Sequence, residues 1–277
     1  MSASEMAHQF RASYAFFERN MNLIKRYWSW ELVWLVYSIA DSMAVSFIGL
    51  GTQQIAGGTN VNTAYLVVYL LIGTLVWRFL STIFYWITDL ISIERWEGTI
   101  EYTLMAPISR LTHVAGQTIF AVSYSMLFTG VILTVTTMVF SIDLSKANLF
   151  GGAVMLLAGS FSFVGVGIMA STLPLLFPER GQQMTHVFIA LLLLVSGVYY
   201  PINVLPLLLQ KIAIFSPATY VLTGVRQALL DGTSLGDLWP NIWPVLIMGL
   251  FLIPAGLWVF RQAERYAKRT GKLHRNG

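Results

Sequence analysis

The sequence contains no cysteine and few charged residues, and both shortages narrow the class of protein. Without cysteine, the chain forms no disulfide, no thiolate metal site and no cysteine nucleophile. Only 11% of its 277 residues are charged, whereas soluble domains hold about 25%. Because 56% of the residues are hydrophobic, too little polar surface remains to cover a water-soluble fold. The composition predicts an integral membrane protein.

The common motifs of enzyme active sites are missing as well. There is no H-E-x-x-H zinc motif, no nucleophile elbow and no glycine-rich dinucleotide turn. Gly271 and Lys272 do not belong to a nucleotide-binding P-loop, because Tyr266 occupies the place of its first glycine. We therefore expect no catalysis, no metal and no cofactor in this chain. The four histidines lack metal-ligand spacing: His8, His113, His186 and His274.

Long apolar runs predict an all-α fold with six transmembrane helices. A helix needs about 20 apolar residues to cross a bilayer, and six segments qualify: 30–52, 64–91, 111–140, 149–176, 184–201 and 239–262. The following apolar segment, 202–223, is interrupted by proline, which removes backbone hydrogen bonds from a straight span. We expect it to form a re-entrant hairpin of two short helices that pack against protein or face water.

Residues 1–28 do not resemble a cleaved signal peptide. Aromatic and aliphatic residues recur there at alternating spacings of four and three, and arginines lie away from that face. This pattern predicts an amphipathic helix in the membrane interface; the alternative is a helix packed on neighbouring protein. The apolar face consists of Phe10, Tyr14, Phe17, Met21, Ile24 and Trp28.

Basic residues predict the orientation of the chain in a cell membrane. Thirteen lie in the termini and in the loops after the second and fourth spans, against three in the opposite loops, Lys146, Lys211 and Arg226. By the positive-inside rule, both termini and the loop between the second and third spans are cytoplasmic. The net charge of +4 is then an orientation signal, and we expect no nucleic acid partner.

Two charged residues fall inside predicted spans. Asp41 lies about 18 Å into the first span and Arg78 about 21 Å into the second from the cytoplasmic side, at 1.5 Å per residue. Because the two spans are antiparallel neighbours, an intramembrane ion pair is possible, serving either structure or a substrate path. Glu31 and Asp89 lie near span ends, where we expect them to reach headgroups or water.

The segment after the second span is unusually charged. On a helix over 93–105, Ile93, Trp96, Ile100 and Leu104 share one face, and Glu94, Glu97 and Glu101 form an acidic stripe beside it. Pro107 ends the helix. We expect a helix over 93–108 that lies along the membrane, with its acidic stripe toward the cytosol. Such a stripe suits a basic groove on a cytosolic protein better than anionic lipid.

Two stretches carry a resemblance to a known family. R-W-E-G-T-I-E-Y-T-L-M-A-P-I-S-R, residues 95–110, resembles the cytoplasmic coupling segment of type-2 ABC transporter permeases, which have the type V exporter fold. S-G-V-Y-Y-P-I-N-V-L-P, residues 196–206, continued by S-P-A-T-Y at 216–220 and by Arg226, resembles the hairpin before their last span. The interfacial helix, six spans, coupling segment and hairpin follow the order of that family over essentially the whole chain.

The resemblance implies a permease without its own nucleotide-binding domain. Such permeases pair with a second copy and with two cytosolic ATPase subunits, which hold ATP and magnesium. Pro201, Pro206 and Pro217 would shape the outer hairpin. The residues implied to contact the ATPase are Arg95, Glu97, Gly98, Thr99 and Glu101.

Two other functions stay open from the sequence alone. An ion-coupled secondary transporter usually shows broken helices in matching halves or a relay of carboxylates, and this chain has one broken region. A membrane scaffold is the other alternative. The substrate is not specified, so drug, lipid and lipid-linked glycan all remain. Four aromatic residues are candidates for a cavity lining: Trp34, Tyr37, Trp77 and Phe188.

Overall fold

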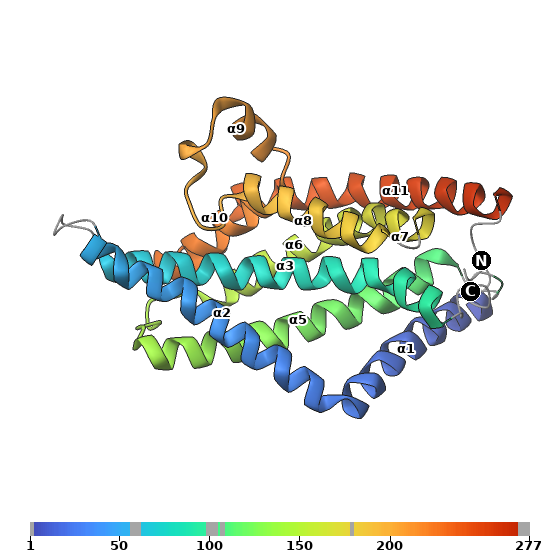
Figure 1. The fold of residues 1–277 in the computed structure, drawn as a ribbon, viewed down its shortest axis with the longest axis horizontal. Coiled ribbons are helices and arrows are strands. Elements are labelled where there is room, and N and C mark those ends of the chain that lie inside the picture. The colour runs from blue at the N-terminus through green and yellow to red at the C-terminus, as the bar shows by residue number, and fades with distance from the viewer. Residues whose placement is uncertain (1–2, 56–61, 98–104, 106–108, 178–179, 271–277) are drawn as a thin grey trace.

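The computed structural model describes residues 3–55, 62–97, 105, 109–177 and 180–270, and the regular elements within them are all helices. The predicted all-α class is therefore confirmed (Figure 1). The helices are α1 (Ala3–Arg26), α2 (Trp28–Ile55), α3 (Thr63–Glu97), α5 (Arg110–Phe140), α6 (Leu149–Ala170), α7 (Thr172–Leu176), α8 (Gly181–Ser196), η1 (Ile202–Val204), α9 (Leu207–Ala213), α10 (Pro217–Leu230) and α11 (Trp239–Arg269).

Within the described residues, five helical segments are long and apolar enough to cross a membrane: α2, α3, α5, α6 with α7, and α11. Helices α9 and α10 form a sixth candidate that is bent by 81°. Helix α8, with 16 residues, is about 24 Å long, which is less than the roughly 30 Å of a hydrocarbon core. The structure thus supports five to six spans.

Helix boundaries differ from the sequence prediction in two places. The predicted fifth span, 184–201, ends as a helix at Ser196, because Gly197 adopts a left-handed conformation with φ of 71°. The second span continues past its predicted end at 91, since α3 runs without interruption to Glu97. The first five residues of the expected helix at 93–108 therefore belong to α3 instead of to a separate helix.

Helix α6 lies at the centre of the bundle. In the span formed by α6 and α7, 72% of an 18-residue apolar stretch is buried, against 22% of such a stretch in α2 and in α5. Glycines let α6 and α11 approach at backbone distance. A Cβ atom added to Gly165 would lie 2.6 Å from the backbone carbon of Leu252, and one added to Gly256 would lie 2.8 Å from the carbonyl oxygen of Gly165. Small residues at such crossings allow close van der Waals packing in a membrane.

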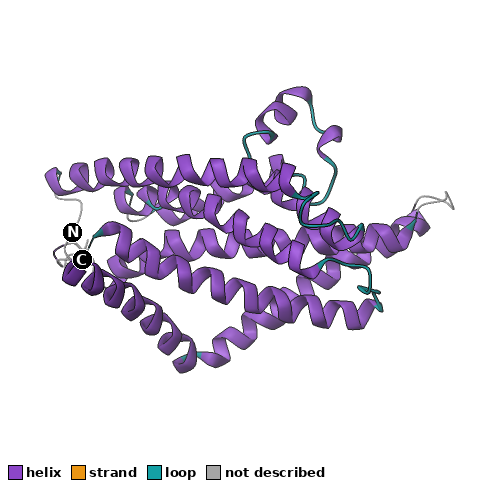
Figure 2. Cartoon of the chain, turned by 180° about the vertical axis from the view of Figure 1, so that it is seen from behind, coloured by secondary structure: helices purple, strands orange, loops and turns teal. Residues whose placement is uncertain are grey.

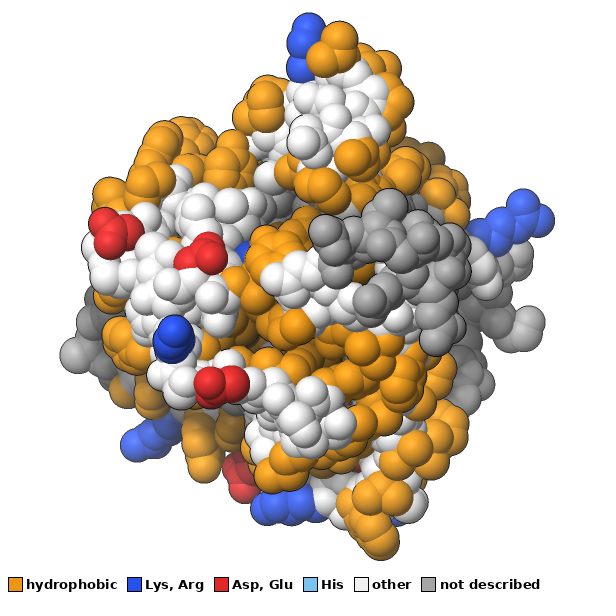
Figure 3. All heavy atoms as spheres, turned by 90° about the vertical axis from the view of Figure 1, so that its left-hand side faces the viewer, with side chains coloured by type: hydrophobic (Ala, Val, Ile, Leu, Met, Phe, Trp, Pro, Cys, Tyr) orange, Lys and Arg blue, Asp and Glu red, His pale blue; other side chains and the backbone are white. Residues whose placement is uncertain are grey.

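The beginning of α1 and the end of α11 lie at the same end of the bundle, which we call the terminal end (Figure 1). Helix α1 runs from the terminal end along α5 to a bend at Tyr27, after which α2 begins (Figures 1 and 2). The opposite end, viewed directly in Figure 3, has few charged side chains, and hydrophobic side chains surround it on its flanks. This distribution suits a bundle embedded in lipid.

Each proline of the predicted hairpin marks the start of a short helix. Pro201 caps η1, Pro206 caps α9, and Pro217 is the first residue of α10. Proline suits these positions because its fixed φ is compatible with a helix start and its missing N–H has no partner to lose there. Two short helices over this segment, as predicted, are present, and α9 projects sideways from the bundle (Figure 1).

We expect Gly165→Val to destabilise the bundle, because the new side chain collides with the backbone of α11. Overpacking of this kind costs about 1–3 kcal/mol, so the melting temperature of the detergent-solubilised protein should fall by about 5 °C. The matched control is Gly130→Val on α5, where an added Cβ meets nothing within 4 Å. Equal melting temperatures for the two variants would contradict the close α6–α11 contact.

Candidate functional site

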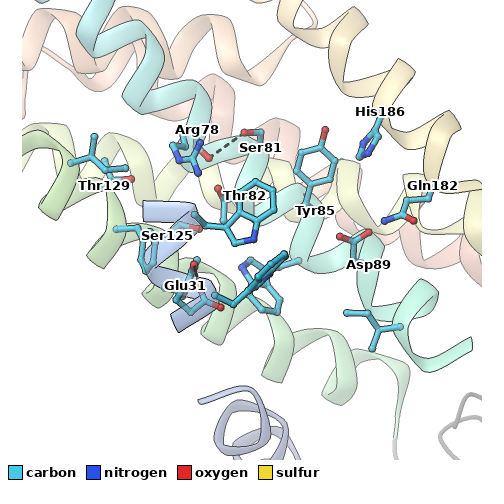
Figure 4. Close-up of a pocket in the computed structure, with 17 residues that line it drawn as sticks. Glu31, Arg78, Ser81, Thr82, Tyr85, Asp89, Ser125, Thr129, Gln182 and His186 are labelled. Carbon is cyan, nitrogen blue, oxygen red and sulfur yellow. Dashed lines mark hydrogen bonds between the residues drawn. The ribbon is translucent and has the colours of Figure 1, made fainter. Parts of the chain in front are cut away.

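A cavity of about 610 Å³ lies between α2, α3, α5 and α8. Polar side chains from all four helices line it, among them Glu31, Arg78, Ser125 and His186 (Figure 4). Its ionisable residues are Glu31 from α2, Arg78 and Asp89 from α3, and His186 from α8. A cavity that combines apolar walls with a few convergent polar groups is the usual form of a small-molecule site.

Helix α3 supplies the long wall of this cavity. Arg78, Thr82, Tyr85 and Asp89 line it, and at 100° per residue they fall within a narrow sector of the helix. The opposite face of α3 is apolar and fully buried against the core, as at Phe79, Ile83 and Ile87. The same helix therefore anchors the bundle on one side and presents polar groups on the other.

Arg78, one of the two predicted intramembrane charges, lies in the cavity wall. Asp41 lies on the neighbouring helix α2 and acts electrostatically on Arg78, but Asp41 is not in the cavity lining. Among the described residues, neither Asp41 nor Arg78 forms an ion pair within 4.0 Å. A direct Asp41–Arg78 ion pair stays a prediction.

Glu31 and Asp89, which we expected to reach headgroups or water, both line the cavity. The hydroxyl of Tyr124 on α5 donates a hydrogen bond of 2.5 Å to Glu31 Oε2. Asp89 lies across from His186 of α8, with which it interacts electrostatically (Figure 4). Position along a span sets the depth of a side chain, whereas its direction depends on which neighbours cover the other faces.

Of the four aromatic residues expected to line a cavity, Trp34 does so. Tyr37, Trp77 and Phe188 are not in the lining; Trp77 packs against the core, and Phe188 stacks on Phe84 with ring centroids 6.0 Å apart. Sequence reasoning missed the other aromatic walls. They include Tyr85 and Trp86 on α3 and Tyr124 and Phe128 on α5. The four-residue spacing of Tyr124 and Phe128 was the available signal.

Glu94 is buried and does not belong to an exposed acidic stripe. Its side chain lies 3.3 Å from Nε2 of His113 at the start of α5, and Glu94 is 1% exposed. Phe16 of α1 covers His113, with ring centroids 4.4 Å apart. The prediction failed for Glu94 because α3 extends past it as a straight helix, which turns this carboxylate toward α5.

The residues implied to contact an ATPase lie where α3 ends. Arg95 and Glu97 belong to the last turn of α3, and their side chains lie outside the described residues, as do Gly98, Thr99 and Glu101. Ser109 follows this segment and is the N-cap of α5. Its hydroxyl accepts a hydrogen bond from the backbone N–H of Thr112. The segment therefore connects two helices that both line the cavity.

Helix α1 is tied to the start of α5 by polar contacts. Ser13 donates to the carbonyl of Thr112, Gln9 contacts Ser109 and Thr112, and Asn20 donates to Gln117. Gln117 in turn donates to the carbonyl of Trp86 on α3. On the other side of α1, Phe10 and Tyr14 of the predicted apolar face are exposed. The helix thus packs on protein with one face and leaves aromatic rings free on another.

A profile of the ABC-2 type transporter family matches residues 14–230, which is most of the chain. The chain belongs to the ABC-2 type transporter family. The family predicted from the sequence is therefore confirmed.

Two curated permeases are similar to this ABC-2 permease. The probable multidrug ABC transporter permease YbhR of Escherichia coli (strain K12) is 24% identical over 171 residues, which are 61% of this chain and 45% of that protein. The linearmycin resistance permease protein LnrN of Bacillus subtilis (strain 168) is 26% identical over 169 residues, 60% of this chain and 43% of that protein. The chain therefore covers less than half of either relative.

In this ABC-2 permease, Arg226 joins α10 to the end of α8 and to α3. Its guanidinium donates hydrogen bonds to the carbonyls of Gly197 (3.0 Å) and Val198 (2.6 Å). It also lies over the ring of Tyr69, 3.6 Å from the ring centroid. The sequence prediction placed Arg226 in an outer loop. In the structure Arg226 is partly buried, and its hydrogen bonds hold the turn before the hairpin.

We expect Arg226→Ala to loosen this turn, because two carbonyls lose charge-assisted partners and Tyr69 loses its cation. The cost should be about 3 kcal/mol in the free energy of unfolding. Arg265→Ala, at an exposed position of α11, serves as the control. Chemical denaturation followed by tryptophan fluorescence measures both variants, and equal stability would show that these contacts contribute nothing.

Proposed function

We propose that this chain is the membrane-spanning permease subunit of an ABC exporter that moves a hydrophobic or amphipathic substrate outward. The observation that carries this proposal is the family match over residues 14–230, which includes the coupling segment and the hairpin. The mixed aromatic and polar cavity supports it, because a drug-like or lipid-like molecule has the same mixture of surfaces. The two similar permeases carry multidrug and linearmycin-resistance names.

A separate cytosolic ATPase would supply the energy, with ATP and magnesium bound to that subunit. The proposed contacts are Arg95, Glu97, Gly98, Thr99 and Glu101. The segment that carries them joins α3 to α5, so a force on it reaches both helices directly. Since α3 is unbroken from Thr63 to Glu97, a displacement at its end moves Arg78 and Asp89 in the cavity wall.

The proposed assembly contains two copies of this chain and two ATPase subunits in a cell membrane. The beginning of α1, the end of α11 and the end of α3 share the terminal end of the bundle (Figure 1), and most basic residues belong to segments at that end. The positive-inside rule then makes the terminal end cytoplasmic. On this orientation α9 and α10, begun by Pro206 and Pro217 after Pro201, form the outer re-entrant hairpin.

An ion-coupled secondary transporter is the second candidate, and one observation favours it. The cavity holds two carboxylates, Glu31 and Asp89, together with His186, and such groups can relay protons in carriers. Substrate export from proteoliposomes distinguishes the two functions: an ABC exporter needs the ATPase and ATP, whereas a carrier needs only an ion gradient.

The direct test of the main proposal is partner capture. The tagged chain is co-expressed with an ATP-binding cassette ATPase encoded beside it, extracted in mild detergent and purified by its tag. We expect a stable complex with one ATPase per permease chain. Purification of the intact permease alone, with gradient-driven export in proteoliposomes, would refute the ABC assignment.

Charge reversal of the coupling segment gives a sharper prediction. In Glu97→Lys with Glu101→Lys, two positive charges replace two carboxylates of the acidic stripe and would repel a basic cleft on the ATPase. We expect substrate-stimulated ATPase activity of the assembled complex to fall at least about tenfold, since like charges at a docking site cost several kcal/mol. Activity is measured as phosphate release with and without substrate.

The control for this double variant is Asp143→Lys with Asp237→Lys, which reverses the charge at two exposed positions at the other end of the bundle. The loops that carry them are joined by hydrogen bonds from Asn148 to the carbonyls of Ala228 and Thr233. This control should keep full stimulated activity. Equal activity of both double variants would remove the coupling role from Glu97 and Glu101.

A further inference from the structure

Six aromatic side chains from three helices line the cavity: Trp30, Trp34, Tyr85, Trp86, Tyr124 and Phe128. They contact one another, with ring centroids 5.6 Å apart for Trp86 and Tyr124 and 4.3 Å apart for Tyr124 and Phe128. Aromatic faces carry partial negative charge and attract cations, most strongly for tryptophan. They also offer large flat apolar area to the rings of a ligand.

Asp89 adds a carboxyl group that the protein leaves without a direct partner among the described residues. Among the described residues, no hydrogen bond or ion pair involves Asp89, and the groups that act on it electrostatically are His186 and Tyr85. Glu31, the other carboxylate, already accepts the Tyr124 hydroxyl. An unpaired, partly buried carboxylate in a low-dielectric wall attracts a cation much more strongly than one in water.

The positive charge of Arg78 does not neutralise Asp89. Arg78 lies eleven residues earlier on α3, so the two share one face but are separated by about 16 Å along the axis. Arg78 itself interacts electrostatically with Asp41, Tyr37 and Tyr124. The cavity wall holds two carboxyl groups and one guanidinium, and the guanidinium lies away from the Asp89 end.

One further group in the wall lacks a partner. The hydroxyl of Ser125 on α5 is buried and makes no hydrogen bond in the structure, and the residue is 2% exposed. A buried hydroxyl without a partner costs about 1–3 kcal/mol. Such a cost is tolerated where a bound molecule supplies the missing contact, and Ser125 lies beside Phe128 and Glu31 in the lining.

We propose that this cavity binds lipophilic organic cations, with Asp89 as the counter-ion and the surrounding aromatic rings as the walls. The inference rests on the proposed function, because it names the substrate class of the same exporter. A flat or branched aromatic cation would place its charge near Asp89, on the side of His186 and Gln182, and its rings against Trp34, Trp86 and Phe128. The Arg78 end of the cavity would hold the uncharged part of the molecule.

Tetraphenylphosphonium and tetraphenylborate test this charge selection. The two ions have nearly the same size and shape and opposite charge, so a difference in binding reports electrostatics. Radiolabelled ions are equilibrated with the full chain in nanodiscs without any ATPase, and empty nanodiscs of the same lipid correct for partitioning. We expect the phosphonium ion to bind at least about tenfold more tightly than the borate ion.

Asp89→Asn should lower the affinity for tetraphenylphosphonium at least about tenfold while the melting temperature stays unchanged, because the carboxylate has no partner to lose. The matched control is Asp143→Asn in the exposed loop between α5 and α6. There the backbone N–H of Ser145 donates to Asp143 and lowers the pKa of that carboxyl, so the control also removes a negative charge. It should bind the ion like the unaltered protein.

A second variant is Trp34→Leu. Because the Trp34 side chain is 47% exposed, we expect this variant to fold without the indole. We expect it to bind tetraphenylphosphonium several-fold more weakly. Equal binding by Asp89→Asn and Asp143→Asn would overturn the proposal. So would tighter binding of tetraphenylborate that is lost in Arg78→Gln, since the cavity would then select anions.

The outcome is independent of the ATPase experiments. A permease that captures its ATPase but does not distinguish the two ions keeps the exporter function and loses the cation specificity. A permease that selects tetraphenylphosphonium through Asp89 but captures no ATPase keeps the cation site and loses the exporter function.

Discussion

The burial of one face of α3 is the contact on which the rest of the structure depends. Phe79, Ile83 and Ile87 are packed into the core against α6, and their burial sets the rotation of the helix about its axis. Once that rotation is set, the 3.6-residue period places Arg78, Tyr85 and Asp89 on the opposite side. The cavity chemistry therefore follows from how the apolar face is packed, and a rotated α3 would bury charge in the core.

Helix α3 also connects the terminal end of the bundle to the turn after α8. At its terminal end, Glu94 pairs with His113 of α5, and Phe16 of α1 covers that pair. At its other end, Tyr69 lies against Arg226, which holds the turn after α8. Under the proposed function, a movement at the end of α3 would be transmitted along this one continuous helix to the cavity and to the hairpin, which would couple the proposed ATPase to the cavity.

Buried polar groups in this bundle differ in how well they are satisfied. The guanidinium of Arg226 has two carbonyls and an aromatic ring, and Asn20 and Gln117 satisfy each other. Asp89 and the hydroxyl of Ser125 have no such hydrogen bonds in the described residues. Unsatisfied polar groups in a membrane are costly. Asp89 and Ser125 share the cavity wall, where a bound ligand would supply the missing contact, whereas other unsatisfied atoms, such as the hydroxyls of Ser42 and Thr118, lie outside it.

The sequence by itself determined the all-α membrane class, most of the long apolar helices, the short proline-started helices before α11 and the family, but it counted residues 184–201 as a span, whereas α8 ends at Ser196. Composition, apolar run length and proline chemistry are local properties, so they can be read without a fold. Only the tertiary structure decided that Glu31 and Asp89 face a shared cavity, that Glu94 is buried, and that Arg226 holds the turn before the hairpin. Depth along a helix is set by the chain, but the direction of each side chain depends on which helices cover its other faces, and this is a property of packing.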